Sequence, residues 1–357
     1  MPQIIEIITV DFGHNTGQEF AKEFAKNMFS ETIPGIEKKL EAFDNAKIKR
    51  RNFCVPVEFF ARDYSFEEKN RLFQEISLEH SVNAIEDCLT NAGFTKEELT
   101  DIIYVNTTGL ATPSMDAMII NKMRLNKNIN RLPIWGLGCA GGVSGIGKAM
   151  MIAKANPGAV IMLICVELCT LTFRRNDLSK SNFIATSLFS DGICACLIAG
   201  DEVIKRIPRQ IKKNEIISSR SRLYYDSHDV MGWDFLNEGF KVVFSRDIPN
   251  IIHENVKQDI EDYLKLEGLG INDITNFIAH PGGAKVIQAY IDALALNPAM
   301  MTNTQEVLSS YGNMSSVSVL YVLNEFFRNG FKDGYGLMIS LGPGFSSEMA
   351  LLKISNF

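Results

Sequence analysis

Continuous apolar runs constrain the fold of this chain more than any other feature of its sequence. Residues 159–168 read AVIMLICVEL, and residues 191–200 read DGICACLIAG. A run without polar alternation is typical of a strand that is buried on both faces of a sheet. Shorter apolar runs predict further strands at residues 4–10, 101–109, 132–139 and 274–280. A sheet built from such strands needs helices on both of its sides.

Helical patterns separate these strands. Residues 66–93 form the longest amphipathic pattern, and Gly93 is a plausible end for that helix. Further helical spacing occurs at residues 17–29, 282–294 and 317–327. Residues 307–316 are predicted to be a loop, and residues 335–354 to be two strands joined by a Gly-Pro-Gly bend. The alternation of strands and helices indicates the α/β class.

The length of the chain suggests two halves. Its 357 residues are 46% hydrophobic, which is enough for a large core. A polar stretch near residues 200–215 is the best place for a passage between halves. The predicted division is therefore residues 1–210 and residues 211–357. No internal repeat is visible in the sequence.

Charge and hydropathy exclude several classes of protein. The 36 basic and 42 acidic residues give a net charge of −6 and are well mixed along the chain. No basic stripe marks a nucleic-acid surface. No apolar run approaches the roughly 18 residues of a membrane span, and the N-terminus lacks a signal-peptide pattern. We expect a cytoplasmic protein with no nucleic-acid partner and no stable membrane insertion.

The seven cysteines do not form a disulfide pattern. Their number is odd and their spacing is scattered. Cys165, Cys169, Cys194 and Cys196 lie within apolar runs, without a CxxC motif or a nearby histidine. We interpret them as small buried hydrophobic residues and expect no metal site.

Three apolar segments end in a residue with useful chemistry. Cys139 precedes glycines and a helical pattern, so the helix dipole would favour its thiolate. His280 follows a predicted strand and could pair with that thiolate. Asn313 lies in YGNMSS and can donate to an oxyanion without titrating. Each residue alone also has a structural interpretation: a packed cysteine, a hydrogen-bonded histidine or an ordinary turn.

The motifs around these residues are more specific in combination. GCAGG, HPGG, YGNMSS and GPGF occur in this order, together with VELCTLTFRRND and SLFSDG. From its first strand to its C-terminus, the chain resembles the type III polyketide synthases, the chalcone synthase-like family of the thiolase superfamily. GNMSS followed directly by a helix, and GPGF near the end, are more similar to this branch than to the ketoacyl-ACP synthase III enzymes.

The resemblance implies a fold, an assembly and a set of roles. The fold would be the thiolase-like five-layer αβαβα arrangement, the assembly a homodimer, and the substrates malonyl-CoA and an acyl-CoA starter, with no cofactor. Cys139 would carry the growing chain, while His280 and Asn313 would assist decarboxylation. The nucleophile would belong to the N-terminal half, and the histidine and asparagine to the C-terminal half. The residues that would line the substrate cavity are Phe189, Thr107, Thr108, Cys169, Leu171, Val242, Ser315, Gly342, Pro343 and Gly344.

The chain departs from plant members at four places. Val242 occupies the position of a second gatekeeper phenylalanine of the plant members, and Cys169 occupies the position of a threonine that lines their cavity. Thr112 replaces a methionine that crosses the dimer interface in plant enzymes. The basic residues for CoA are not clearly matched: Lys38, Lys49 and Arg50 are the candidates, and Lys47 and Arg51 could substitute.

These features predict a condensing enzyme with an aliphatic starter. The expected products are alkylpyrones, made from malonyl-CoA and a medium- or long-chain fatty acyl-CoA. Alternatives are an alkylresorcinol synthase, a ketoacyl-ACP synthase III-like enzyme, and an inactive thiolase-fold scaffold. An intact set of Cys139, His280 and Asn313 argues against the scaffold, and mixed charge argues against an acidic carrier protein.

Overall fold

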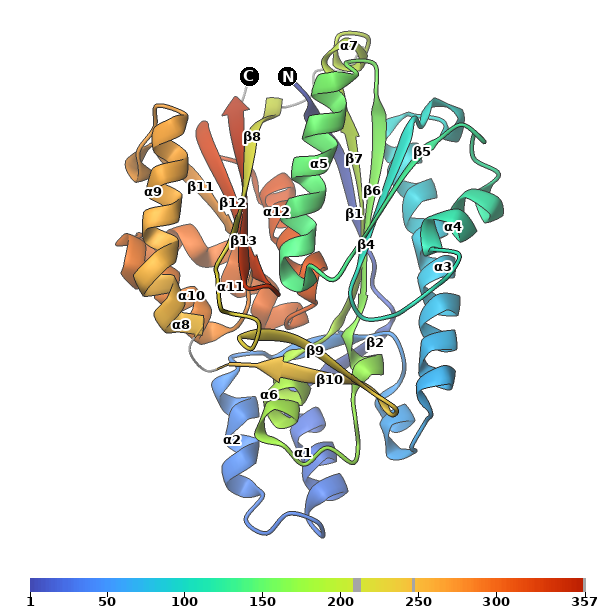
Figure 1. Cartoon of the computed structure of the whole chain (residues 1–357), viewed down its shortest axis with the longest axis vertical. Helices are drawn as coiled ribbons and strands as arrows, with labels where there is room; N and C mark the ends of the chain where they lie inside the picture. Colours follow the sequence, from blue (N-terminus) through green and yellow to red (C-terminus); the bar gives the residue numbers. More distant parts are fainter. Residues whose placement is uncertain (208–212, 246–247, 356–357) are drawn as a thin grey trace.

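A nine-stranded mixed sheet runs through the whole protein (Figure 1). The computed structural model describes residues 1–207, 213–245 and 248–355. The strand order is β11-β12-β13-β8-β1-β7-β6-β4-β5. The strands are β1 (Gln3–Thr9), β4 (Asp101–Asn106), β5 (Asn130–Trp135), β6 (Val160–Leu168), β7 (Asp191–Ala199), β8 (Lys213–Leu223), β11 (Ile274–Ala279), β12 (Gly334–Gly342) and β13 (Ser346–Ser355). Gln3 of β1 pairs with Glu215 of β8, which joins two half-sheets into one.

The helices form three layers around the two half-sheets (Figure 1). Helices α5 (Gly141–Ala155) and α12 (Ser318–Asn329) lie between the half-sheets and contact both. Outer helices cover the two remaining faces: α3 (Phe66–Ala92) and α4 (Met115–Met123) on one side, α9 (Lys257–Leu266) and α10 (Ala284–Leu294) on the other. The prediction of a five-layer αβαβα fold is confirmed.

The continuous apolar runs are explained by these layers. In β6, Ile161, Leu163 and Cys165 face the central helices, while Met162 and Ile164 face α3 and α4. Both sets are fully buried. Since side chains alternate across a strand, burial on both faces requires an apolar residue at every position. The cysteines of β6 and β7 are such core residues, and all seven cysteines are buried and free.

The two halves repeat one pairing pattern, which the sequence did not reveal. In the first half, β4 is parallel to β6, β6 antiparallel to β7, and β7 antiparallel to β1. In the second half, β11 is parallel to β12, β12 antiparallel to β13, and β13 antiparallel to β8. Helices α5 and α12 precede the equivalent strands β6 and β12. The two halves therefore share one topology, although their amino-acid sequences show no visible repeat.

Glycines allow α5 to fit between the half-sheets. A Cβ on Gly142 would lie 2.2 Å from the carbonyl oxygen of Ser316, and one on Gly145 would lie 2.7 Å from a methyl group of Leu163. Any larger side chain at these positions would push the helix out of the core. This close packing also fixes the N-terminal end of α5, where Cys139 lies.

A separate group of elements lies beyond one end of the sheet (Figure 1). It contains two small antiparallel sheets, one of β2 and β3 and one of β9 and β10. Its members are β2 (His14–Gly17), α1 (Gln18–Phe29), α2 (Glu37–Asn45), β3 (Arg50–Phe53), α6 (Lys180–Leu188), β9 (Met231–Leu236) and β10 (Gly239–Phe244). The sequence predicted only α1 among them.

Two local predictions were wrong. Residues 307–311 belong to α11 (Thr302–Tyr311), because this helix continues until Gly312 takes a left-handed φ of 77°. The strand predicted to end at Cys139 ends at Trp135.

The polar stretch 200–215 contains α7 (Asp201–Ile204) and the start of β8. The predicted boundary between residues 210 and 211 lies outside the described residues and stays a prediction.

No helix in the described parts of the chain combines the length and the apolar character needed to cross a bilayer. Helix α8 (Ile248–Ile251) completes the set of α-helices in these parts.

Candidate active site

Cys139 lies in a 3-10 turn, Gly138–Ala140, directly before α5. The chain enters this turn through Gly136 and Gly138, whose φ angles of 91° and 46° favour glycine. The backbone N–H of Gly138 donates to the hydroxyl of Thr107 at 3.0 Å. A Cβ on Gly138 would lie 2.6 Å from the ring of Pro343. The turn is therefore clamped from two sides, and Cys139 has a fixed position.

The side chains of Ser315 and Asn313 hydrogen-bond the thiol of Cys139. Both precede α12, the helix equivalent to α5. The amide oxygen of Asn313 accepts from the backbone N–H of Ser315 at 2.9 Å. Its amide nitrogen donates to the carbonyl of Gly282 at 3.4 Å. Asn313 therefore connects the thiol with the turn that follows His280.

His280 has the most unusual environment of the three predicted catalytic residues. It follows β11, and its backbone N–H donates to Ile339 of β12 at 2.9 Å. The residue is 4% exposed, yet neither ring nitrogen has a hydrogen-bond partner. Buried polar atoms are nearly always paired, so two unpaired nitrogens indicate that a bound molecule completes the site. Cys139, Asn313 and the turn that follows His280 thus come together from three segments. The catalytic roles of Cys139, His280 and Asn313 stay predictions.

Burial keeps both titratable groups neutral. It raises the pKa of the Cys139 thiol to about 12, although hydrogen bonds from Ser315 and Asn313 act in the opposite direction. Burial also lowers the pKa of His280 to about 3. The helix dipole was expected to favour the thiolate, but desolvation outweighs it here. Near neutral pH the site holds a thiol and a neutral imidazole, which can act as the base for that thiol.

Cys139 is expected to react with iodoacetamide at a rate that is nearly constant between roughly pH 5 and pH 9, because the thiol and the imidazole share one proton throughout that window. In His280→Ala the thiol must ionise alone, so the rate should rise about tenfold per pH unit. Mass spectrometry of labelled peptides measures both rates. Cys169 is the matched control, because it lines the same cavity with the same 5% exposure. Labelling of Cys169 as fast as Cys139 would contradict the assignment.

The Cys139 cavity contains most of the predicted lining residues. Its empty volume is about 410 Å³ including its opening to solvent. The predicted residues that line it are Thr107, Thr108, Cys169, Phe189, Val242, Ser315 and Pro343.

Three predicted lining residues lie elsewhere. Leu171 lines an adjoining small pocket beside Thr108. A Cβ on Gly342 would lie 2.3 Å from the carbonyl oxygen of Leu137, so Gly342 supports the Cys139 turn. Gly344 packs against Leu223. These glycines are needed for close backbone packing, and they contribute no side chain to the cavity.

A second, larger compartment adjoins the first. Its empty volume is about 710 Å³ including its opening, and four residues line both compartments: Cys169, Phe189, Trp233 and Val242. Its wall is mostly apolar. The aromatic side chains in that wall are Phe24, Phe29, Phe53, Phe60, Phe173, Phe189, Trp233 and Phe240. These four shared residues separate the Cys139 cavity from a space that suits an apolar chain.

The β9–β10 hairpin forms one wall of both compartments, which the sequence reasoning missed except for Val242. Trp233 lies directly opposite Val242 in the strand register. The ring of Phe244 packs edge-on against Phe189, with 6.5 Å between the ring centres. Phe244 therefore contributes an aromatic ring to the cavity wall, two residues after Val242, the position at which plant members have a phenylalanine. The sequence signal was the stretch FKVVFSRD, in which the family resemblance places Val242 and leaves Phe244 without a role.

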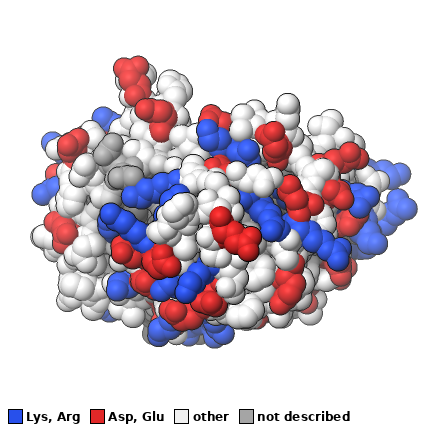
Figure 2. Space-filling view, turned by 90° about the horizontal axis from the view of Figure 1, so that it is seen from below, with Lys and Arg blue, Asp and Glu red and all other residues white. Residues whose placement is uncertain are grey.

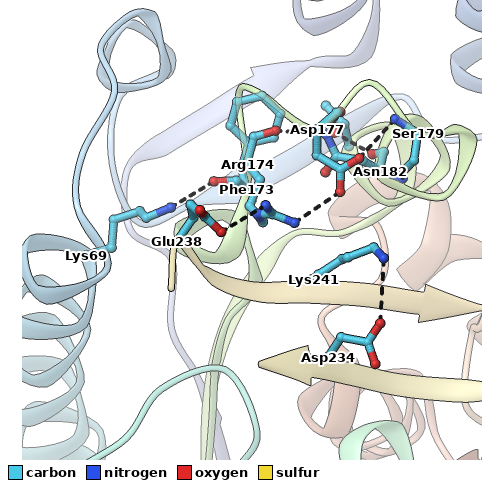
Figure 3. A network of polar contacts seen from close by, with 10 residues as sticks. Lys69, Phe173, Arg174, Asp177, Ser179, Asn182, Asp234, Glu238 and Lys241 are labelled. Carbon is cyan, nitrogen blue, oxygen red and sulfur yellow. Dashed lines mark hydrogen bonds and ion pairs between the residues drawn. The ribbon is translucent and has the colours of Figure 1, made fainter. Parts of the chain in front are cut away.

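Ion pairs hold the tip of this hairpin (Figure 3). Arg174 contacts Asp177 at 3.4 Å and Glu238, in the hairpin turn, at 3.5 Å. Lys69 of α3 donates to the carbonyl of Phe173 at 3.0 Å, next to Arg174. Glu238 is thereby tied to the segment that leads into α6, and the hairpin stays over the cavity.

Glu167 is a buried carboxylate that the sequence reasoning did not select. One oxygen accepts from Thr107 N–H at 3.0 Å and from the Thr108 hydroxyl at 2.9 Å, and the other accepts from the Ser316 hydroxyl at 2.6 Å. Burial raises its pKa to about 7, against these hydrogen bonds. Its position at the end of the apolar run of β6 was the available signal.

The predicted CoA-binding residues are on the surface. Lys38 lies on α2, while Lys49 and Arg50 lie at the start of β3; all three are exposed. Arg50 donates to the carbonyl of Ser310 at 3.2 Å. Arg51, which was considered as a substitute, is only 3% exposed and is not a surface cation. On the face bearing these elements, Lys and Arg alternate with Asp and Glu (Figure 2).

Among the described residues, no three His, Cys, Asp or Glu side chains are grouped so that they could hold a metal ion.

The fold and the site place the chain among thiolase-fold condensing enzymes. The solved structure of 1,3,6,8-tetrahydroxynaphthalene synthase from Streptomyces coelicolor A3(2) matches 99% of this chain and 100% of its own, with a TM-score of 0.92 and 24% identity. The C-terminal type III polyketide synthase domain of Steely1 from Dictyostelium matches 99% of each chain, with a TM-score of 0.89 and 26% identity.

The sequence comparisons identify the family. The chalcone and stilbene synthase N-terminal domain matches residues 15–202, and the C-terminal domain matches residues 215–355. The chain is 42% identical to the "Putative chalcone synthase" of Bacillus subtilis (strain 168) over 99% of both proteins. It is 32% identical to 1,3,6,8-tetrahydroxynaphthalene synthase of Streptomyces peucetius subsp. caesius, over 90% of this chain and 85% of that one. The chain belongs to the chalcone and stilbene synthase family and is a type III polyketide synthase, an acyltransferase-type enzyme.

Proposed function

We propose that this enzyme condenses malonyl-CoA with a medium- or long-chain fatty acyl-CoA starter and releases alkylpyrones. One observation carries the proposal: a second, phenylalanine-rich compartment adjoins the Cys139 cavity, and Val242 is one of the residues that line both. Burial of each methylene contributes about 0.8 kcal/mol, so a tail of several carbons gains substantially there. Cys169 lines both compartments. It stands where plant members have a threonine, so the cavity lacks a hydroxyl with which a polar phenolic starter could form a hydrogen bond.

Starter loading uses Cys139 and His280 in this proposal. The thiol attacks the thioester carbonyl of the starter while His280 accepts its proton. The carbon–sulfur bond to CoA breaks, and CoA leaves as a thiol with the proton returned by His280. The product is an acyl-enzyme on Cys139. We propose that no cofactor is needed, since thioester exchange requires only a nucleophile and a base.

Chain extension uses Asn313 and His280. Loss of CO₂ from malonyl-CoA leaves an enolate, whose oxygen accepts hydrogen bonds from the amide and the imidazole. The enolate carbon attacks the acyl-enzyme carbonyl and expels the Cys139 sulfur, so the lengthened chain is left on CoA. The lengthened chain is transferred back to Cys139 with release of CoA, and a second malonyl unit is added in the same way. The distal enol oxygen of the triketide then attacks its thioester carbonyl, CoA leaves as the thiol, and the pyrone is closed. The two unpaired nitrogens of His280 support this assignment.

Product analysis tests the proposal. The enzyme is incubated with malonyl-CoA and acetyl-, hexanoyl-, lauroyl-, palmitoyl- or coumaroyl-CoA, and the products are identified by mass spectrometry. We expect the highest kcat/KM with the longer aliphatic starters, and triketide pyrones as products. Preference for coumaroyl-CoA over every fatty acyl-CoA would refute the starter class, and tetraketide resorcinols would refute the pyrone.

We also propose a homodimer in the cytoplasm. Apolar side chains remain exposed beside β5, the edge strand of the sheet: Leu110, Trp135, Phe235 and Leu236. The rings of Trp135 and Phe235 are 5.9 Å apart, so they form one patch. Thr112 is exposed and too short to reach far into a partner. Seven free cysteines suit a reducing compartment.

Sedimentation velocity at about 1 μM should show a species of twice the 39.9 kDa chain mass, because an apolar patch at a sheet edge favours self-association. Phe235→Arg should shift the protein toward the monomer, since a charge would be buried in the interface. A stable wild-type monomer at this concentration would refute the dimer.

A further inference from the structure

Arg51 is a buried cation without an acidic partner. It lies in β3, is 3% exposed, and has its guanidinium 4.9 Å from the ring centre of Phe53 and 5.8 Å from that of Phe43. Among the described residues, no carboxylate lies within 4.0 Å of it. Burial lowers its pKa to about 10, partly offset by the charge of Asp191, so it stays protonated at neutral pH.

The nearest carboxylate is already occupied by other groups. Asp191 accepts hydrogen bonds from the backbone N–H groups of Cys54 and Thr170, each at 2.8 Å, and from the Thr170 hydroxyl. It offers Arg51 only a weak, distant attraction. A buried charge is costly unless it is well hydrogen-bonded. The side chain therefore depends on other acceptors.

Those acceptors are the carbonyl groups at the C-terminal end of α6. One terminal nitrogen of Arg51 donates to the carbonyl of Thr186 and, at 3.1 Å, to that of Phe189. The last carbonyls of a helix have no partner within the helix and carry partial negative charge. Arg51 satisfies two carbonyls at once and fixes the backbone that carries the Phe189 ring.

The same backbone segment holds Asn313. The N–H of Asn313 donates to the carbonyl of Leu188 at 3.0 Å, and the N–H of Ser190 donates to the carbonyl of Asn313 at 2.8 Å. These two bonds form a short parallel bridge between Phe189 and Asn313. A Cβ on Gly312 would lie 3.1 Å from Cγ of Arg51, so the stem of Arg51 also packs against Gly312, the residue that precedes Asn313.

We propose that Arg51 is a positioning residue that acts through Asn313. Its guanidinium fixes the segment from Thr186 to Ser190, and the Phe189–Asn313 bridge transmits this to the Asn313 amide. Arg51 thereby controls malonyl-CoA decarboxylation while affecting the loading of a short starter little, because the Cys139 turn is held separately by Thr107 and Pro343. The inference rests on the proposed role of Asn313 in decarboxylation.

The test compares the two half-reactions in Arg51→Met. Methionine keeps the length and apolar contacts of the stem and removes the cation. Acylation of Cys139 by acetyl-CoA, whose short chain does not reach the second compartment that Arg51 also lines, should stay within about threefold of wild type when measured by intact-protein mass spectrometry. Release of CO₂ from malonyl-CoA should fall about 10- to 100-fold, the order expected when a catalytic group is displaced by a fraction of an ångström to an ångström. Equal losses in both half-reactions would show a general structural role and refute the proposal.

A double-mutant cycle separates this proposal from the proposed function. If Arg51 acts through the amide, Arg51→Met should have no further effect on CO₂ release in an Asn313→Ala background. Full additivity would refute the positioning role. If Asn313→Ala alone decarboxylates at the wild-type rate, the proposed role of Asn313 fails, and the inference about Arg51 fails with it.

Two further variants guard against a folding defect. Arg51→Lys keeps the charge but offers a point ammonium in place of the planar fork, so CO₂ release should recover only partly. Arg131→Met is the control for the loss of an arginine in general. Arg131 pairs with the buried carboxylate of Asp116 and does not contact α6 or Asn313, so its removal should leave both half-reactions unchanged. If Arg51→Met does not fold, Arg51→Lys becomes the test. A wild-type rate of CO₂ release in Arg51→Lys would then refute the proposal. A loss of CO₂ release in Arg51→Lys with unchanged acylation of Cys139 would support it.

Discussion

Asn313→Ala is expected to lower CO₂ release from malonyl-CoA by about 10²- to 10³-fold, the usual cost of removing one oxyanion donor. Acylation of Cys139 by the starter should stay within a few-fold of wild type, because the neutral imidazole still accepts the thiol proton. Radiometric CO₂ release and intact-protein mass spectrometry measure the two steps separately. The expected separation arises because Asn313 is a non-titrating amide that hydrogen-bonds the thiol without taking its proton.

His280→Ala is the informative comparison for this prediction. His280 is expected to serve both half-reactions, as a base for the thiol and as a donor to the enolate, so both should fall. If Asn313→Ala releases CO₂ at the wild-type rate, the enolate role of Asn313 is wrong. If it loses acylation as strongly as His280→Ala, its main role is to hold the thiol.

Val242→Phe is expected to shift starter preference toward short chains. Val242 lines both compartments opposite Trp233, so a phenyl ring there would narrow the passage between them. Excluding two or three methylenes at about 0.8 kcal/mol each changes the ratio of hexanoyl- to palmitoyl-CoA kcat/KM by about 15- to 60-fold. Competition between the two starters, read out from the product masses, measures this ratio directly.

Val242→Ala is the matched control, because it widens the same passage. The ratio should stay near wild type or move slightly in the opposite direction. A shift of Val242→Ala in the same direction as Val242→Phe would mean that the hairpin has moved. An unchanged ratio in Val242→Phe would show that the acyl tail takes another path from Cys139.

Stability should also respond to pH through His280. The pKa of His280 is lowered to about 3 in the folded protein, against about 6.5 in an unfolded chain. The unfolded state therefore binds the additional proton between these values, and this contribution to stability is lost as pH falls through about 6 toward 3. Glu167 acts in the opposite sense: its raised pKa of about 7 means that its contribution declines as pH rises from about 4.5 to 7.

The sequence determined the layered fold and the chemically distinctive residues. The runs in β6 and β7 are typical of strands buried on both faces, since most of their side chains face a hydrophobic layer; the buried carboxylates Glu167 and Asp191 lie at the strand ends nearest the site. The motifs around Cys139, His280 and Asn313 identified the candidate site, because glycine and proline at these turns are required by close backbone packing. Both signals are local, so they can be read without a structure.

The tertiary structure decided what depends on contacts between distant segments. Arg51 looks like a surface cation beside Lys49 and Arg50, and only the packing of α6 and the Phe189–Asn313 bridge buries it. The sequence around Trp233 and Phe244 is compatible with many surface or buried strand positions. Only the packing and register of the β9–β10 hairpin place these two side chains in the cavity wall. The thiol at the start of α5 was expected to ionise, but burial determines its pKa. Burial and partner choice are properties of the folded chain, because they depend on residues more than a hundred positions apart, such as Arg51 and Thr186. The hairpin register is local in sequence, but only the packing of the hairpin on the cavity gives it a role.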